Sequence, residues 1–170
     1  VVGIISLGLI GRMVAERLAE PKGGRVLLPV TFIRQHHMTC VPATLTALST
    51  YWGRPVAHLE VAEEICYDGT SYQAERAWAE RNGWLVREFT VDWATSRALI
   101  DRGLPFTLSL QYTGSGHLQA VVGYDEPRGT VLIRDPGQAQ FGESVAEGPY
   151  ETQRSSGPRG LPLLPPEGAH

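Results

Sequence analysis

Helical and strand patterns are segregated along this chain, and their order limits the folds that it can adopt. Hydrophobic periodicity and chain breakers predict three helices at about 40–53, 57–66 and 71–81. Strand-like runs follow at 106–112, 117–124 and 130–134, and the turn-forming loop 125–129 joins the last two. A helical half followed by consecutive strands predicts an α+β fold in which an antiparallel sheet packs against the helices.

The helix that begins at Cys40 has the clearest local signals. Pro42 suits the first turn, where a missing N–H costs nothing, and Gly53 suits the position just after the last turn. Apolar residues recur at steps of four, three and four, which predicts one buried stripe of Val41, Leu45, Leu48 and Trp52. In the second helix the expected inward positions are Leu59, Ala62 and either Ile65 or Cys66, so Cys66 is interpreted as a core residue.

Four further elements complete the expected fold. Residues 25–33 are apolar and β-branched apart from Pro29, so an edge or irregular strand is expected there. Residues 84–91 alternate like a strand, with Trp84, Val86 and Glu88 on one face. Asp92 can cap a short helix that runs to about residue 101, and a last strand is expected near 161–164.

Length and composition indicate one domain over residues 25–165. The chain has 170 residues, of which 42% are hydrophobic and 19% are charged, a balance that argues against disorder. Residues 1–24, with a helix at 12–19, are expected to form a leading helix or linker, such as the remnant of a neighbouring domain. Residues 166–170 are expected to be a frayed tail.

The same composition argues against several partners and cofactors. The net charge is −3, and no basic stripe interleaves with aromatic residues, so no nucleic acid is expected to bind. Two cysteines do not make a disulfide framework, although one Cys40–Cys66 bridge stays open, and no Cys/His cluster has zinc spacing. We therefore expect no metal and no cofactor. A nucleotide loop at Gly8 and Gly11 is disfavoured because the glycine spacing is not G-x-G-x-x-G.

The first ten residues form an apolar run that bears on membrane association. This run is too short to span a bilayer, and it lacks the positively charged start and the cleavage site of a signal peptide. The chain is therefore expected to contain no membrane span and to be cytoplasmic.

Three residues far apart in the sequence have the types found at a cysteine-nucleophile site. Cys40 opens a helix, where the helix dipole and free N–H groups favour the thiolate. His117 follows a Gly-Ser-Gly run at the start of a strand, and Asp135 ends the next strand, across one hairpin. Each residue also has an ordinary interpretation: a buried core thiol, a structural histidine and a strand-to-turn aspartate.

Three other side chains are candidates near this site. Gln35, five residues before Cys40, offers a side-chain N–H donor for an oxyanion beside the backbone N–H of Cys40, although it also suits the surface. His37 can border the site because it lies three residues before Cys40. Asp125 competes with Asp135, but it sits at the other end of the His117 strand.

The chain resembles the papain-like bacteriocin-processing (double-glycine leader) cysteine peptidases and their broader relatives over roughly residues 28–140. The resemblance rests on Gln35, on the run from Thr39 to Thr44, on the run from Gly116 to Asp125, and on the run from Ile133 to Pro136. It implies that Cys40 is the nucleophile, His117 the general base and acid, Asp135 the orienting carboxylate and Gln35 the oxyanion donor.

The resemblance also implies a reaction and a substrate class. A peptide or protein substrate would be cleaved through an acyl-enzyme, with water or another amine as the final acceptor. Val41 stands where these families commonly carry glycine, and Gln35 is one residue closer to Cys40 than in the double-glycine enzymes. These differences favour the alternative of a catalytically silent papain-like module that binds a peptide or protein partner.

Overall fold

The computed structural model describes residues 24–112, 115–138, 141–145 and 158–166. The helix expected at 12–19 lies outside the described residues, as do nearly all of the leading segment 1–24 and the tail 166–170. None of the helices in the described ranges is both long and apolar enough to cross a lipid bilayer.

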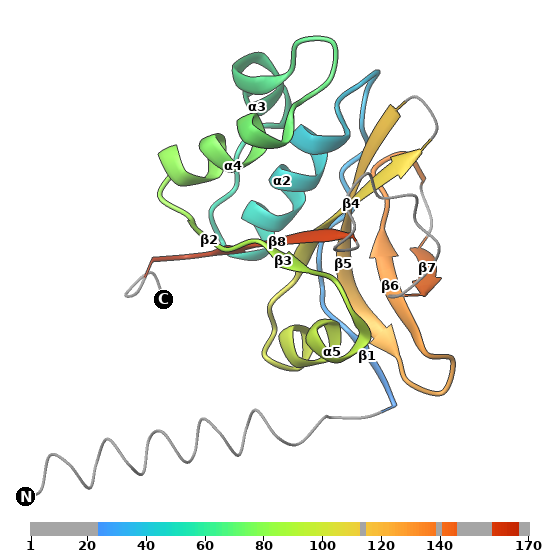
Figure 1. Cartoon of the computed structure of the whole chain (residues 1–170). Helices are drawn as coiled ribbons and strands as arrows, with labels where there is room; N and C mark the ends of the chain where they lie inside the picture. Colours follow the sequence, from blue (N-terminus) through green and yellow to red (C-terminus); the bar gives the residue numbers. More distant parts are fainter. Residues whose placement is uncertain (1–23, 113–114, 139–140, 146–157, 167–170) are drawn as a thin grey trace, which may run out of the picture.

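The molecule is an α+β structure in which helices that precede residue 102 pack on an antiparallel sheet built mainly from residues 106–164 (Figure 1). The helices are α2 (Cys40–Tyr51), α3 (His58–Ile65), α4 (Tyr72–Arg81) and α5 (Trp93–Asp101). The main strands are β4 (Phe106–Tyr112), β5 (Ser115–Asp125), β6 (Thr130–Arg134), β7 (Phe141–Val145) and β8 (Arg159–Leu164), in the spatial order β8-β4-β5-β6-β7. The order and pairing of the elements confirm the fold class that the sequence predicts.

Two hydrophobic cores form because successive residues of β5 point to opposite faces of the sheet. Leu118, Ala120 and Val122 pack with α2, α3 and α4, whereas Val121 and Tyr124 pack with Ile100 of α5. A register shift between Val121 and Gly123 interrupts the alternation on β5. The sheet is therefore covered by α2–α4 on one face and by α5 on the other.

Helix α2 is the central helix of the first core. It begins at Cys40, has Pro42 in its first turn, and is followed by Gly53 with a φ of 70°, as the sequence predicts. All residues from Val41 to Ser49 are buried, so the helix is enclosed on every side rather than along one stripe. Trp52 is only partly buried, because it lies just beyond the last turn. This enclosure fixes the position of the Cys40 backbone.

The inward face of α3 differs from the prediction. Leu59 is 61% exposed and Ala62 is only partly buried, whereas Val61, which was not predicted, points into the core together with Ile65, which was. These two residues are one turn apart and make a contiguous apolar contact with α2 and α4, which Leu59 does not. The interpretation of Cys66 as a core residue is also wrong: Cys66 is the partly exposed residue after α3, and its thiol donates to the backbone carbonyl of Met38 at 3.3 Å.

Three predictions about the strands need correction. The strand expected at 25–33 is limited to β1 (Arg25–Leu27), which pairs with β5. The strand expected at 84–91 is divided into β2 (Leu85–Val86) and β3 (Phe89–Thr90), which both pair with β8. Their interruption lies opposite Leu161 and Pro162, and proline has no N–H to donate to a neighbour. Strand β7 was not predicted, and β8 begins two residues earlier than expected.

The hairpin between β5 and β6 is confirmed. Asp125 ends β5 and accepts a hydrogen bond from the backbone N–H of Arg128 at 3.2 Å, which stabilises the turn. His117 lies at the start of β5, so Asp125 and His117 are separated by almost the whole strand.

Candidate active site

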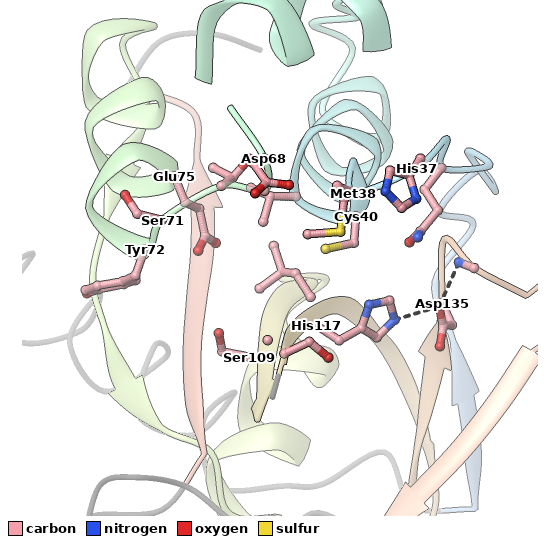
Figure 2. A pocket seen from close by; sticks show the side chains of 18 of the residues that line it. His37, Met38, Cys40, Asp68, Ser71, Tyr72, Glu75, Ser109, His117 and Asp135 are labelled. Carbon is pink, nitrogen blue, oxygen red and sulfur yellow. Dashed lines mark hydrogen bonds and ion pairs between the residues drawn. The ribbon is translucent and has the colours of Figure 1, made fainter. Parts of the chain in front are cut away.

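A cavity of about 970 Å³ opens between the start of α2, the loop that leads into α4, and the first residues of β5 (Figure 2). All four residues singled out from the sequence, Cys40, His117, Asp135 and Gln35, contribute to its lining, and so does His37. Figure 2 shows His117 between Cys40 and Asp135. The fold therefore brings together residues that are up to 100 positions apart in the sequence.

Cys40 is the first residue of α2 and is partly buried. Burial by itself raises the pKa of the Cys40 thiol, but hydrogen bonds with His117 and with the backbone of Leu118, and the charge of His117, lower it below its ordinary value. The loop before the helix is held by Thr39, whose Oγ1 accepts from the backbone N–H of His36 at 2.8 Å. The sulfur therefore lies at a fixed helix start in an environment that favours the thiolate.

His117 interacts with both an acid and the thiol. Its Nε2 lies 2.9 Å from Oδ1 of Asp135, and its imidazole also hydrogen-bonds Cys40. The hydrogen bonds with Asp135 and then with Cys40 raise the pKa of His117 to about 9, although burial acts in the opposite direction. At neutral pH these shifts favour a thiolate and an imidazolium side by side.

Asp135 accepts three hydrogen bonds and is almost completely buried. Oδ1 accepts from His117 and, at 2.7 Å, from the backbone N–H of Gly137; Oδ2 accepts from Nε2 of Gln119 at 2.6 Å. Burial raises the pKa of Asp135, but these hydrogen bonds and the charge of His117 together hold it below its ordinary value. Asp135 is therefore an ionised acceptor with a fixed orientation.

Gln119 is a site residue that the sequence analysis missed. It is buried on β5 two residues after His117, so the two side chains leave the strand on the same face. Ala120 pairs with Arg134 on β6, which places Asp135 directly beside Gln119. In the sequence, the signal that could have identified Gln119 was its spacing of two residues from His117 on the same predicted strand.

Gln35 lies on the same side of the cavity as Asp135. Its backbone N–H donates to the carbonyl of Pro136 at 2.9 Å, which ties this loop to the end of β6. Its Oε1 atom is buried and has no hydrogen-bond partner among the described residues. The structure therefore places Gln35 in the cavity wall rather than on the open surface.

The competing candidate Asp125 lies elsewhere. Neither Asp125 nor the second cysteine, Cys66, is part of the cavity lining. His58 is not part of it either: its Nε2 lies 3.1 Å from Oγ1 of Thr39, and its ring stacks on that of His36 with a centroid distance of 5.4 Å. These two histidines brace the loop that precedes Cys40.

Within the described ranges, no group of three or more His, Cys, Asp or Glu side chains is arranged to hold a metal ion.

Comparison with known proteins identifies related sequences and folds. The sequence model of the Peptidase C39 like family matches residues 27–155. No protein with a curated description matches the chain in sequence.

Solved structures share the fold at low sequence identity. The peptidase domain of Streptococcus ComA, a bi-functional ABC transporter involved in quorum sensing, has a TM-score of 0.61 at 16% identity, covering 81% of this chain and 98% of that domain. A double glycine motif protease from an AMS/PCAT transporter, solved with its leader peptide, has a TM-score of 0.63 at 19% identity, covering 85% and 96%. Xylellain, a cysteine protease from Xylella fastidiosa, has a TM-score of 0.65 at 12% identity, covering 89% of each chain. The papain-like α+β fold expected from the sequence is thereby confirmed.

Proposed function

The chain belongs to the Peptidase C39 like family, and we propose that it is a cysteine peptidase that uses Cys40 as nucleophile and His117 as general base and acid. The observation that carries this proposal is the continuous hydrogen-bonded series from Cys40 through His117 to Asp135 in the wall of one cavity. A core cysteine or a structural histidine would need no such series.

The proposed reaction begins with an ion pair. Nε2 of His117 is engaged by Asp135, which leaves Nδ1 to exchange a proton with the sulfur of Cys40. The Cys40 thiolate attacks the carbonyl carbon of a peptide bond, and the carbonyl oxygen becomes an oxyanion. His117 then protonates the leaving amine, which leaves a thioester on Cys40. Water, activated by the same imidazole, hydrolyses the thioester and restores the thiol.

The oxyanion would be stabilised by hydrogen bonds from N–H groups near the start of helix α2. The backbone N–H of Cys40 lies at the first position of α2, where N–H groups have no partner within the helix. Gln35 is proposed as the second donor, through its side-chain N–H₂ group. This role requires the amide nitrogen to face the reacting carbonyl.

Asp135 and Gln119 are proposed to act through the imidazole. Asp135 holds the Nε2–H of His117 and stabilises the positive charge that the ring carries during the reaction. Gln119 is proposed as a positioning residue, because its 2.6 Å hydrogen bond fixes the second oxygen of Asp135. The carboxylate therefore cannot rotate away from His117 without breaking a buried hydrogen bond.

A peptide is the proposed substrate. The cavity is large enough for several side chains, and the related double glycine motif protease was solved with a leader peptide. The assembled thiol, imidazole and carboxylate support an enzyme over a catalytically silent binding module, despite Val41 and the spacing of Gln35.

The test is cleavage of a proteome-derived peptide library, followed by mass spectrometry of new termini. We expect new termini from the wild-type protein and from Cys66→Ala, and none from Cys40→Ala. Because Cys66 lies outside the cavity, it is the matched control for loss of a thiol. Incubation with added amines shows in the same spectra whether an amine competes with water for the acyl group. New termini that persist in Cys40→Ala would overturn the proposal.

A further inference from the structure

A second polar group of side chains lines the cavity on the side away from Asp135, and the proposed reaction does not use it. Figure 2 shows Glu75, Tyr72 and Ser109 there, across the cavity from His117 and Asp135. Thr70 and Arg159 belong to the same lining. These residues come from α4 and the loop before it, from β4 and from β8.

Glu75 is a buried carboxyl without a complete set of hydrogen bonds. It lies in the first turn of α4, and the residue is only 2% exposed. The hydroxyl of Thr107 hydrogen-bonds the carboxyl, but Oε1 has no hydrogen-bond partner among the described residues. Burial raises the pKa of Glu75 to about 7, although the charge of Arg159 and the Thr107 hydrogen bond act to lower it. An unpartnered buried carboxyl oxygen destabilises the fold, so packing alone does not account for it.

Arg159 brings a positive charge to the same wall. It begins β8 directly opposite Ser109 of β4, and it donates to Oγ of Ser109 at 3.4 Å. Its guanidinium lies over the ring of Tyr72, which fixes its direction. Thr70 adds a buried hydroxyl oxygen that also has no hydrogen-bond partner within the described part of the chain. The wall therefore combines a carboxyl, a guanidinium and a hydroxyl within one cavity.

We propose that this wall is a specificity subsite that binds a side-chain carboxamide, asparagine or glutamine, of the peptide substrate. The inference rests on the proposed peptidase function and names a feature of its substrate. A small rotation about the last torsion of Glu75, which is soft in glutamate, turns the unpartnered oxygen toward such a group.

The two opposite charges of the wall favour a neutral polar group. A lysine or arginine of the substrate would be repelled by Arg159 as well as attracted by ionised Glu75, and an acidic side chain would meet the reverse, so neither regains its full cost of desolvation. An apolar side chain would leave Oε1 of Glu75 without a partner. A carboxamide gives its N–H to the carboxylate and its C=O to the guanidinium, and the protonated form of Glu75 can donate to the same C=O.

The experiment uses the same peptide library and counts the residues at each position on both sides of the cleaved bond. The wild-type protein should show asparagine or glutamine enriched at one fixed position. The variant Glu75→Met should lose this enrichment, because methionine keeps the length of the side chain but removes its acceptor. The control Glu80→Met, at a half-exposed position of the same helix, should keep it.

A measurement on the wild-type protein makes the test independent of whether Glu75→Met folds. Replacing the preferred amide of one synthetic peptide by leucine should lower kcat/KM by roughly 10- to 100-fold. Replacing it by lysine or glutamate should lower kcat/KM at least as much. Cleavage that depends on Cys40 but shows no amide preference, or a preference unchanged in a folded Glu75→Met, overturns the subsite alone. Absence of any Cys40-dependent cleavage overturns the peptidase proposal and the subsite with it.

Discussion

Nε2 of His117 lies 2.9 Å from Oδ1 of Asp135, although the two residues are 18 positions apart. His117 lies on β5 and Asp135 directly follows the neighbouring antiparallel strand β6, at the end of the hairpin that faces α2. The hydrogen bond between Nε2 and Asp135 leaves the other ring nitrogen of His117 directed to Cys40. Its effect on the reactivity of the Cys40 thiol can be measured directly.

The first prediction concerns the reactivity of the two cysteines. Iodoacetamide at pH 6 to 7 should label Cys40 much faster than Cys66, because the folded state lowers the pKa of Cys40 and keeps thiolate present below the ordinary titration range. When the pH is lowered, the labelling of Cys40 should stay fast until the pH passes through the lowered pKa of its thiol. Mass spectrometry of the labelled peptides gives both rates.

The control for this measurement is His117→Ala, which removes the group that hydrogen-bonds the thiol. In that variant, labelling of Cys40 at pH 6 to 7 should slow markedly, while labelling of Cys66 stays as in the wild type. Equal, slow labelling of both cysteines in the wild-type protein would favour a silent binding module.

The second prediction concerns Gln35. The variant Gln35→Ala should lower kcat by roughly 100- to 1,000-fold if its side chain donates to the oxyanion. Iodoacetamide labelling of Cys40 should not change, because that reaction forms no oxyanion. An unchanged kcat would remove Gln35 from the mechanism and leave Cys40 and His117 in place.

The third prediction concerns Gln119. The variant Gln119→Leu keeps the bulk of the side chain and removes the donor to Oδ2 of Asp135, so kcat should fall by roughly 10- to 100-fold while KM changes little. The matched control is Gln73→Leu, because Gln73 is exposed on α4. A merely structural role for Gln119 would lower the melting temperature but leave kcat of the folded protein unchanged.

The fourth prediction tests which side chains of helices α2 and α3 pack in the core. Leu48 is completely buried in α2, so Leu48→Ala should lower the free energy of unfolding by about 2 to 5 kcal/mol. Leu59→Ala should change it by less than about 0.5 kcal/mol, because that side chain is 61% exposed. Denaturant unfolding of both variants measures the difference. A large loss at Leu59 would contradict the observed face of α3.

The sequence predicted correctly those features whose cause lies in residues close by in the chain, such as helix ends and turns. Pro42 and Gly53 mark the two ends of α2 through their own backbone preferences. Asp92 accepts from the backbone N–H of Thr95 at 2.7 Å and begins α5 as expected. The loop between β5 and β6 was likewise recognisable from its turn residues. Such features can be predicted because the physical cause lies within a few positions in the sequence.

The errors occurred where distant residues decide the structure. Leu59 and Val61 are both compatible with an apolar face on α3, and only packing against α2 and α4 selects Val61. The break between β2 and β3 depends on their common partner β8, which lies about 75 positions away. The roles of Cys40, His117 and Asp135 came from a family resemblance combined with local signals. Gln119 and Glu75 were missed because their partners, Asp135 and Arg159, lie on other elements.

The central claim is that Cys40 forms a covalent acyl-enzyme with a peptide, and one measurement tests it most directly. The protein is mixed with an intact peptide that it cleaves, and the reaction is quenched in acid milliseconds to seconds after mixing. The protein is then digested and analysed by mass spectrometry. The account predicts that the acyl part of the peptide is attached to Cys40 early in the reaction and disappears as product accumulates. Cleavage that proceeds at the same rate in Cys40→Ala, or an acyl group attached to Cys66 instead, would contradict it.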